Sequence, residues 1–396
     1  MILKGYKYRI RPNKEQEIFI NKSFGCNRFV YNWGLDLKIK EYQQNDKKLS
    51  YFDLVNKLPK LKEENEWLKE VDSQSLQYSL HHLDNSFTKF FREKKSFPRF
   101  KSKHRSKQSF SSYVRKIDFK KQLLTIAKIE NIPIIISREF EGKIKEVVIS
   151  KKPTGKYFAS ILVETLENLP KKKLIKKETA IGVDVGLKLF LVASNGLKID
   201  NPKFLKKSLA KLKKERRRLS KKKKGSNNRN KHRLKLAKIH LKIANQRRDF
   251  LHKLTYYLTH KKQVGSIVIE DLAVSNMIKN HCLAQAISDV GWGEFRRQLD
   301  YKCKWYGKNL IVISRFAPSS KLCPECGQLN QNLTLADREW TCDCGAIHDR
   351  DLLAANNIKN FGIEQYRRNY GNLNACGDDL DVTSLMKQET LTFRWE

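Results

Sequence analysis

The spacing of apolar residues follows three successive patterns along the first half of the chain. Residues 1–12 alternate apolar with charged side chains, as a half-buried strand does, and Pro12 ends this pattern. Residues 14–95 carry apolar positions at helical spacing in three successive regions, which predicts a small helical module. After this module the pattern returns to short apolar runs separated by turns, and we expect strands at 117–127, 132–136, 144–150 and 157–164.

An acidic residue interrupts the first apolar run of the second half. Residues 181–185 predict a buried strand that contains Asp184, and a second strand at 189–193 closes with a hairpin turn at 195–196. A carboxylate among apolar residues is unfavourable unless it is paired or binds a metal. The alternative is an aspartate at a strand end that faces solvent.

A similar arrangement recurs at residues 267–269, which predict a short buried strand followed by Glu270 and Asp271. Sites in α/β proteins lie at the carboxyl ends of strands. We interpret Glu270 as the residue that takes part in the chemistry, and Asp271 as a candidate helix N-cap. A helix at 282–306 and a buried strand at 308–314 are expected to follow.

The last predicted helix covers residues 349–358 and begins with two carboxylates. Asp349 is placed to cap it, which leaves Asp351 in the first turn, where a helix N-terminus favours negative charge. Beyond residue 361 the periodicity is lost, so residues 362–396 predict a poorly ordered tail.

Charge makes nucleic acid the expected partner. The 396 residues hold 81 Lys and Arg against 42 Asp and Glu, a formal net charge of +39, and such an excess indicates a polyanionic partner. There is no apolar run of about 18 residues and no signal-peptide pattern, so we expect no membrane contact and a reducing, cytoplasmic location. Four scattered cysteines are then ordinary thiols: Cys26, Cys282, Cys303 and Cys376.

Two stretches concentrate this charge. Residues 96–113 interleave aromatic and basic side chains, as a nucleic-acid groove does, although a strand edge beside a solvated loop explains them too. Residues 203–248 predict two basic helices with Glu215 as their only acid, and phosphates would neutralise them. The candidate contacts are Arg99, Lys101, Lys103, Arg105, Arg216, Arg217, Arg218, Arg229, Arg233, Arg247 and Arg248.

Two cysteine pairs precede the last helix. Cys323, Cys326, Cys342 and Cys344 form two knuckles of the kind that closes a tetrahedral Zn²⁺ site. Zinc with four protein ligands has no position free for catalysis, so we expect it to hold a loop in shape. The chemistry then falls to Asp184, Glu270 and Asp351, whose hard oxygen ligands suit two Mg²⁺ or Mn²⁺ ions for phosphodiester hydrolysis. Their order along the chain is that of an RNase H-like nuclease core.

The same residues resemble a known family. IGVDVG, IVIEDL, RFAPSSKLCPECG and HDRDLLAANNI are similar to motifs of the OrfB/TnpB family of transposon-associated RNA-guided nucleases, which are relatives of the type V CRISPR effectors. YKYRIRPNKEQ and FGCNRFVYNWGL resemble the N-terminal signature of that family, and KIANQRRDFLHKL and AISDVGW its central one. The resemblance covers nearly all of residues 1–361.

The resemblance implies an α/β plus β-barrel fold. An oligonucleotide-binding wedge barrel would comprise 1–13 and 96–170, interrupted by a helical recognition module at 14–95. A RuvC-like nuclease domain would comprise 178–318 and 347–361, with 203–248 as its basic helical hairpin and a zinc ribbon inserted at 319–346. Asp184, Glu270 and Asp351 match the three catalytic acids, and Asp349 is a supporting neighbour.

The activity implied is cleavage of double-stranded DNA beside a short transposon-adjacent motif. A guide RNA from the transposon end would select the target by base pairing, and a single protein chain would form the ribonucleoprotein. Two departures from the family pattern stand out. The second knuckle, Cys342-x-Cys344, is one residue short, so His348 is an alternative zinc ligand, and Leu353 replaces the usual Asn two residues after the third acid.

Other functions compete with this one. An RNA-guided repressor that does not cut would be expected to lose an acid, and all three are present. A transposase that joins ends uses a similar triad, but the chain shows no separate end-binding module. A zinc-ribbon RNA-binding protein with a structural role would explain the charge and the cysteines, but not the acids in apolar strands.

Overall fold

The computed structural model describes residues 2–172, 174–334 and 337–370. The chain divides into two compact units, Met1–Asn168 with Arg218–Leu241 and Leu169–Arg217 with Lys242–Glu396. None of the helices in the described ranges is both long and apolar enough to span a membrane. The eighth cysteine, Cys376, lies outside these ranges.

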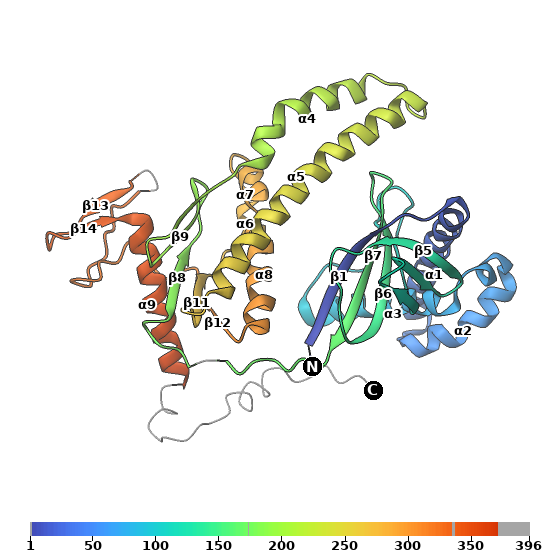
Figure 1. Cartoon of the computed structure of the whole chain (residues 1–396), viewed down its shortest axis with the longest axis horizontal. Coiled ribbons are helices and arrows are strands. Elements are labelled where there is room, and N and C mark those ends of the chain that lie inside the picture. Colours follow the sequence, from blue (N-terminus) through green and yellow to red (C-terminus); the bar gives the residue numbers. More distant parts are fainter. Residues whose placement is uncertain (1, 173, 335–336, 371–396) are drawn as a thin grey trace. The chain divides into compact units, whose positions relative to one another are not determined.

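The first unit is built on a seven-stranded antiparallel sheet of order β2-β6-β7-β1-β5-β4-β3 (Figure 1). Strands β2 and β3 are the two edge strands of this sheet, yet only Tyr113 separates them in the chain. The two edges are therefore close together, and the sheet curls on itself. The predicted strand at 117–127 is two strands with a turn at 119–122. The strands are β1 (Ile2–Ile10), β2 (Gln108–Ser112), β3 (Val114–Asp118), β4 (Leu123–Ile126), β5 (Ile129–Ile135), β6 (Lys143–Lys151) and β7 (Tyr157–Thr165).

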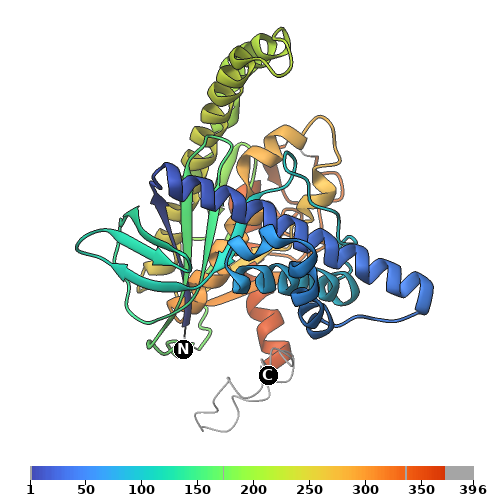
Figure 2. The ribbon, with the colours of Figure 1, turned by 90° about the vertical axis from the view of Figure 1, so that its right-hand side faces the viewer.

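Three α-helices and a short 3₁₀ helix form the predicted helical module. A capping box starts the first helix: the Asn13 side chain accepts a hydrogen bond from the Gln16 backbone N–H at 2.8 Å. This helix contributes Ile20 to the core of the sheet and Leu35 to the core of the module, and Figure 2 shows it crossing from one to the other. The helices are α1 (Lys14–Asn45), α2 (Tyr51–Glu64), η1 (Glu66–Glu70) and α3 (Ser73–Glu93).

The second unit is built on a mixed five-stranded sheet of order β10-β9-β8-β11-β12. Strands β8, β11 and β12 are parallel, and β9 runs antiparallel to β8. Strand β10, which the sequence analysis did not predict, returns antiparallel to β9 after the predicted turn at 195–196. The sequence predicted Asp184 inside a strand over 181–185, but it is the last residue of β8. Pairing with β11 ends at Val183, and Asp184 pairs only with Val192 of β9. The strands are β8 (Ala180–Asp184), β9 (Leu189–Ala193), β10 (Lys198–Asp200), β11 (Ser266–Glu270) and β12 (Asn309–Ile313).

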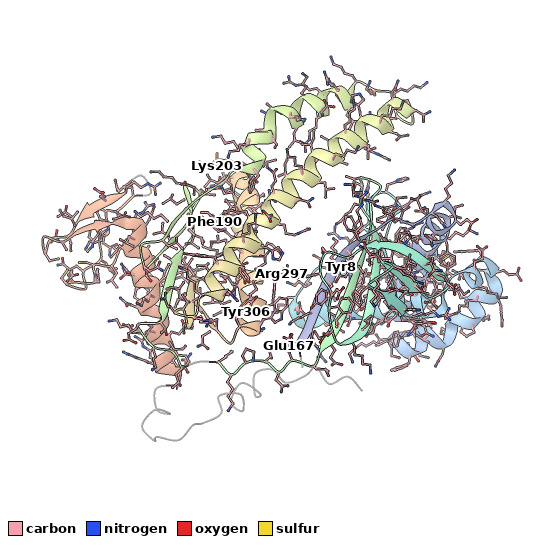
Figure 3. The ribbon with its side chains drawn as sticks, viewed as in Figure 1. Tyr8, Glu167, Phe190, Lys203, Arg297 and Tyr306 are labelled. Carbon is pink, nitrogen blue, oxygen red and sulfur yellow. The ribbon has the colours of Figure 1, made fainter. Side chains whose placement is uncertain are left out.

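Helices cover both faces of this sheet. Phe190 (labelled in Figure 3), Ile181 and Val183 pack against α5 and α8 on one face. On the other face Gly182 and Val268 meet α9, because successive strand residues point to opposite sides. The helices are α4 (Phe204–Ser220), α5 (Asn227–His260), α6 (Val274–Met277), α7 (Ala284–Val290), α8 (Trp292–Trp305) and α9 (Arg350–Tyr370). The end of α4 and the start of α5, within Arg218–Leu241, are grouped with the first unit.

Two helix predictions need correction. The expected helix at 282–306 is split into α7 and α8, because Gly291 adopts a left-handed φ of 77° between them. The tail expected from residue 362 is helical as far as Tyr370, where α9 ends. Its remaining part, 371–396, lies outside the described residues.

Candidate active site

Two parallel strands place Asp184 and Glu270 at the same edge of the sheet. The strands pair in register, Ile269 opposite Val183, so the next residues of each strand are the two carboxylates. Both side chains are half-buried. Burial and the neighbouring charge of Asp351 raise the pKa of Asp184 to about 6. The positive charge of Arg350 lowers the pKa of Asp184 less than its burial and Asp351 raise it. Burial and the charge of Asp184 raise the pKa of Glu270 to about 7.

The third carboxylate reaches this edge because α9 packs very close to the sheet. A Cβ atom on Gly182 of β8 would lie 2.0 Å from the Ala355 carbonyl oxygen, and one on Gly362 of α9 would lie 2.3 Å from a methyl carbon of Val268. Only glycine permits these two approaches. They hold the N-terminal turn of α9, which carries Asp351, near Asp184.

Asp349 caps α9, as predicted. Its Oδ1 accepts hydrogen bonds from the backbone N–H groups of Asp351 at 3.0 Å and Leu352 at 3.2 Å. Its Oδ2 lies 2.8 Å from the Lys198 ammonium of β10. This carboxylate is therefore engaged in fixing the helix start, which leaves Asp351 as the acid that faces Asp184.

Asp271 is not the helix N-cap that the sequence suggested. It forms ion pairs with Arg296 of α8 and Arg315 after β12, and α6 begins at Val274 without a side-chain cap. The hydrogen bond from Arg296, which has the largest effect, and the one from Arg315 lower the pKa of Asp271. The adjacent acids at the end of β11 thus differ: Asp271 is neutralised by cations, while Glu270 is not.

Two arginines of the site were missed by the sequence analysis. Arg338 Nη1 lies 3.4 Å and Arg350 Nη2 3.5 Å from the Asp351 carboxylate. The Arg350 backbone N–H also donates to the Arg338 carbonyl at 2.8 Å, which joins the ribbon to the start of α9. The one available signal was the position of Arg350 beside Asp351; Arg338 lies 13 residues away and is brought in by the ribbon.

The cysteine cluster fits a zinc ion. The Sγ atoms of Cys323, Cys326, Cys342 and Cys344 all lie within 4.8 Å of one another, and two pairs lie 3.8 and 3.5 Å apart. Thiolates about 2.3 Å from a tetrahedral Zn²⁺ are separated by about 3.8 Å. The short second knuckle therefore still brings both thiols to the cluster. In the described part of the chain no other set of three or more His, Cys, Asp or Glu ligands is as close.

His348 lies beside the thiols. Its Nε2 is 3.2 Å from Cys323 Sγ, and its ring packs on Trp340 across the two-stranded ribbon sheet of β13 (Glu339–Thr341) and β14 (Ile347–Asp349). With four thiols in place the geometry favours His348 as a hydrogen-bond donor to the Cys323 thiolate.

Leu353, the departure from the family pattern, is buried against Cys323, Trp340 and Cys342 and anchors the ribbon on α9. Asn357, one turn further along α9, donates hydrogen bonds to the carbonyls of Ser319 and Leu322, each at 2.8 Å. The helix that carries Asp351 is therefore also the helix on which the ribbon is mounted.

The candidate nucleic-acid contacts fall into two groups. Arg99, Lys103, Arg105, Arg216, Arg217, Arg218, Arg233 and Arg248 are exposed. Lys101, Arg229 and Arg247 are half-buried, and each has a partner within the protein. The Lys101 ammonium lies 3.4 Å from the centre of the Tyr31 ring. Arg229 donates hydrogen bonds to the carbonyls of Leu219 and Lys222, and Arg247 forms an ion pair with Asp289. Phe110, expected in the groove at 96–113, lies in the core of the sheet instead.

The remaining cysteines behave as ordinary thiols where they are buried. Burial raises the pKa of Cys26 to about 11 and that of Cys303 to about 12, so both are neutral. Cys282 is exposed.

Family models match three parts of the chain: "Probable transposase" (OrfB_IS605) at residues 160–281, "Cas12f1-like, TNB domain" at 292–358 and "Helix-turn-helix domain" at 1–47. Residues 2–47 form one strand and one long helix, so the third description does not match the structure of this segment.

Two relatives align over almost the whole chain. A "Putative RNA-guided DNA endonuclease" of Streptomyces pristinaespiralis is 41% identical over 96% of this chain and 92% of its own length. The "Putative RNA-guided DNA endonuclease InsQ" of Escherichia coli K12 is 31% identical over 98% and 97%. Among solved structures, a Cas12f1–sgRNA–target DNA complex covers 90% of this chain and 98% of its own, at a TM-score of 0.47 and 14% identity.

Proposed function

We propose, on the premise that this chain belongs to the OrfB/TnpB family, that it is an RNA-guided DNA endonuclease. Its full-length relatives from Streptomyces and Escherichia carry that description. The partners in this proposal are a guide RNA from the transposon end and a double-stranded DNA target beside a short adjacent motif. The net charge of +39 suits both.

In this proposal the mixed sheet with α9 is a RuvC-like nuclease core. The strand order β10-β9-β8-β11-β12 and the two acids at the ends of β8 and β11 support it. The curled sheet would be the wedge barrel, and α1, α2 and α3 the recognition module. The four thiols would hold one structural Zn²⁺ in the ribbon.

The observation that carries the proposal is the pair Asp184 and Glu270 at one sheet edge, with Asp351 near enough for its charge to raise the pKa of Asp184. The three carboxylates do not form a set as close as the four thiols, so a metal would have to draw Asp351 inward. Two half-buried carboxylates with raised pKa values favour a divalent cation. Asp184, Glu270 and Asp351 would hold Mg²⁺ or Mn²⁺, which supplies activated water and stabilises the leaving oxygen of a phosphodiester.

The chain itself contributes orientation and charge. Leu353 and Asn357 fix the ribbon on α9, and the ribbon carries Arg338 to Asp351. With Asp351 as a metal ligand, Arg338 would be placed to bind a phosphate oxygen of the strand, and Arg350 would lie beside the same carboxylate. These arginines would then stabilise negative charge that develops during cleavage.

The test is guide-dependent cleavage by the complex of the full chain with its transposon-end RNA. A plasmid library would carry a matched target beside randomised flanks, in Mg²⁺, with Asp184→Ala as the inactive control. We expect cutting that requires the matching guide and Asp184 and selects one flanking motif. Guide-dependent binding without cutting would instead identify a repressor, and cutting that ignores the guide would refute RNA guidance.

A further inference from the structure

A cavity adjoins the candidate active site on the side of Glu270. Its volume is about 380 Å³, and Glu270 is itself part of its wall. Ligand pockets begin at about 300 Å³. The cavity lies wholly within the second unit, between the end of β11, the segment around α6, and α8. An occupant would therefore lie against one of the three carboxylates.

The chemistry of the walls is that of a nucleobase site. The inner walls are apolar and aromatic, formed by Ile269 and Leu272 together with Trp292 and Phe295 of α8. Ser275 and Asn276 on α6 add an exposed hydroxyl and an exposed amide. Flat apolar walls with a few polar groups hold extruded or unpaired bases in enzymes that act on nucleic acids.

Two exposed guanidinium groups form part of the cavity wall. Arg296 and Arg315 line the cavity, and both pair with the single carboxylate of Asp271. Their side chains remain 47% and 39% exposed, so N–H groups of each are available to a ligand. The two guanidinium groups share a single carboxylate, so their remaining N–H groups suit the phosphate attached to a base in the cavity.

From this arrangement we propose that the cavity binds one unpaired base of the DNA strand being cut, next to the phosphodiester that Glu270 faces. The inference rests on the proposed nuclease function and adds a subsite to it. Seating the base would fix the position of the adjoining phosphate, so the residues of the cavity are positioning residues. A single-stranded segment satisfies the geometry, because a paired base is not available to enter.

The test fills the cavity from its exposed side. Ser275→Trp places a large ring at an exposed position of the cavity wall, where the folded core is least affected. Ile278→Trp is the matched control: it adds the same ring three residues away at a position that is 41% exposed and outside the cavity. Ser275→Ala leaves the cavity open and removes only the hydroxyl.

The substrates are guide-matched duplexes in which each nucleotide around the cut, on either strand in turn, is replaced by an abasic one. For the unmodified protein we expect one position at which base loss slows cleavage by about fivefold or more. Ser275→Trp should cut intact DNA at that reduced rate and be insensitive to base loss there. Ile278→Trp and Ser275→Ala should keep the sensitivity of the unmodified protein.

Several results would overturn the subsite. These are no sensitive position on either strand, sensitivity that persists in Ser275→Trp, or equal loss of cleavage in Ser275→Trp and Ile278→Trp. If the unmodified protein cuts no DNA at all, the proposed nuclease function fails separately. Base binding by the cavity is then tested separately, by the fluorescence of 2-aminopurine in single-stranded DNA without divalent cations. Quenching of this fluorescence that Ser275→Trp abolishes supports the subsite, and absence of quenching refutes it.

Discussion

Glu270 and Asp271 are neighbours in the chain, but their environments shift their pKa values in opposite directions. Burial and the charge of Asp184 raise the pKa of Glu270 to about 7, whereas Arg296 and Arg315 lower that of Asp271. The stability that depends on Glu270 is present below its unfolded pKa and lost as pH rises through 7. The contribution of Asp271 is present above its unfolded pKa and lost as pH falls.

Neutral variants of these two acids should therefore have opposite effects. At pH 8 without added magnesium, Glu270→Gln should raise the free energy of unfolding by about 1–3 kcal/mol, an effect that vanishes near pH 4. Asp271→Asn should lower it, because two guanidinium groups lose their partner. Urea unfolding at both pH values measures the difference. Equal effects of the two variants would contradict the opposite environments of these neighbouring acids.

Arg338 permits a test at a single ion pair. Arg338→Ala should reduce guide-dependent cleavage by about 10²-fold or more, if the side chain stabilises charge on the strand. Zinc content and complex assembly should be unchanged, since its side chain touches Asp351 and not the thiols. Arg338→Lys should restore part of the rate. A variant that cuts as well as the unmodified protein would remove Arg338 from the site.

At the scale of single elements, the close packing of α9 on β8 decides where Asp351 lies. Gly182→Ala would force a Cβ atom to within 2.0 Å of the Ala355 carbonyl, so α9 must shift. We expect a loss of about 1–3 kcal/mol in unfolding free energy, together with loss of cleavage. Gly25→Ala in α1, where nothing lies within 4 Å of the added carbon, should be neutral or slightly stabilising.

The ribbon gives an element-scale prediction on metal binding. His348→Ala should still bind one zinc ion per chain, with affinity reduced about 10- to 100-fold, because the histidine orients a ligand. Cys344→Ser should lose the ion, because it removes one of the four clustered thiols. Metal analysis of the purified proteins, followed by chelator competition, distinguishes weakened zinc binding from loss of the ion. Loss of zinc in both variants would make His348 a ligand.

The elements that the sequence predicted well are those with a local signal. The apolar runs of β8, β11 and β12, the hairpin turn at 195–196 and the cap of α9 by Asp349 all depend on adjacent residues. The partners of Asp271 lie 25 and 44 residues away, and Arg338 reaches Asp351 only because the ribbon folds back. Contacts between distant elements leave no periodic pattern, so the roles of Arg296, Arg315 and Arg338 were not predictable.

At the scale of the whole molecule, the excess of positive charge predicts how nucleic-acid binding depends on salt. Lys223 and Lys224 are exposed in the turn between α4 and α5, and no acidic residue lies between Arg216 and Arg248. Lys57 and Lys60 are equally exposed on α2, but Asp53, Glu63 and Glu64 are on the same helix. Replacing either pair of lysines with glutamines removes two positive charges, so the two double variants have the same net charge.

If the hairpin binds phosphates, Lys223→Gln with Lys224→Gln should weaken nucleic-acid binding. The slope of log affinity against log salt should fall by about 0.9 for each phosphate of duplex DNA that the protein no longer neutralises. Lys57→Gln with Lys60→Gln should change the slope little, because acids on α2 already compensate these lysines. Fluorescence anisotropy with labelled DNA and guide RNA at four salt concentrations gives both slopes. Equal reductions would assign binding to the overall net charge and not to the hairpin, since both variants carry the same total charge.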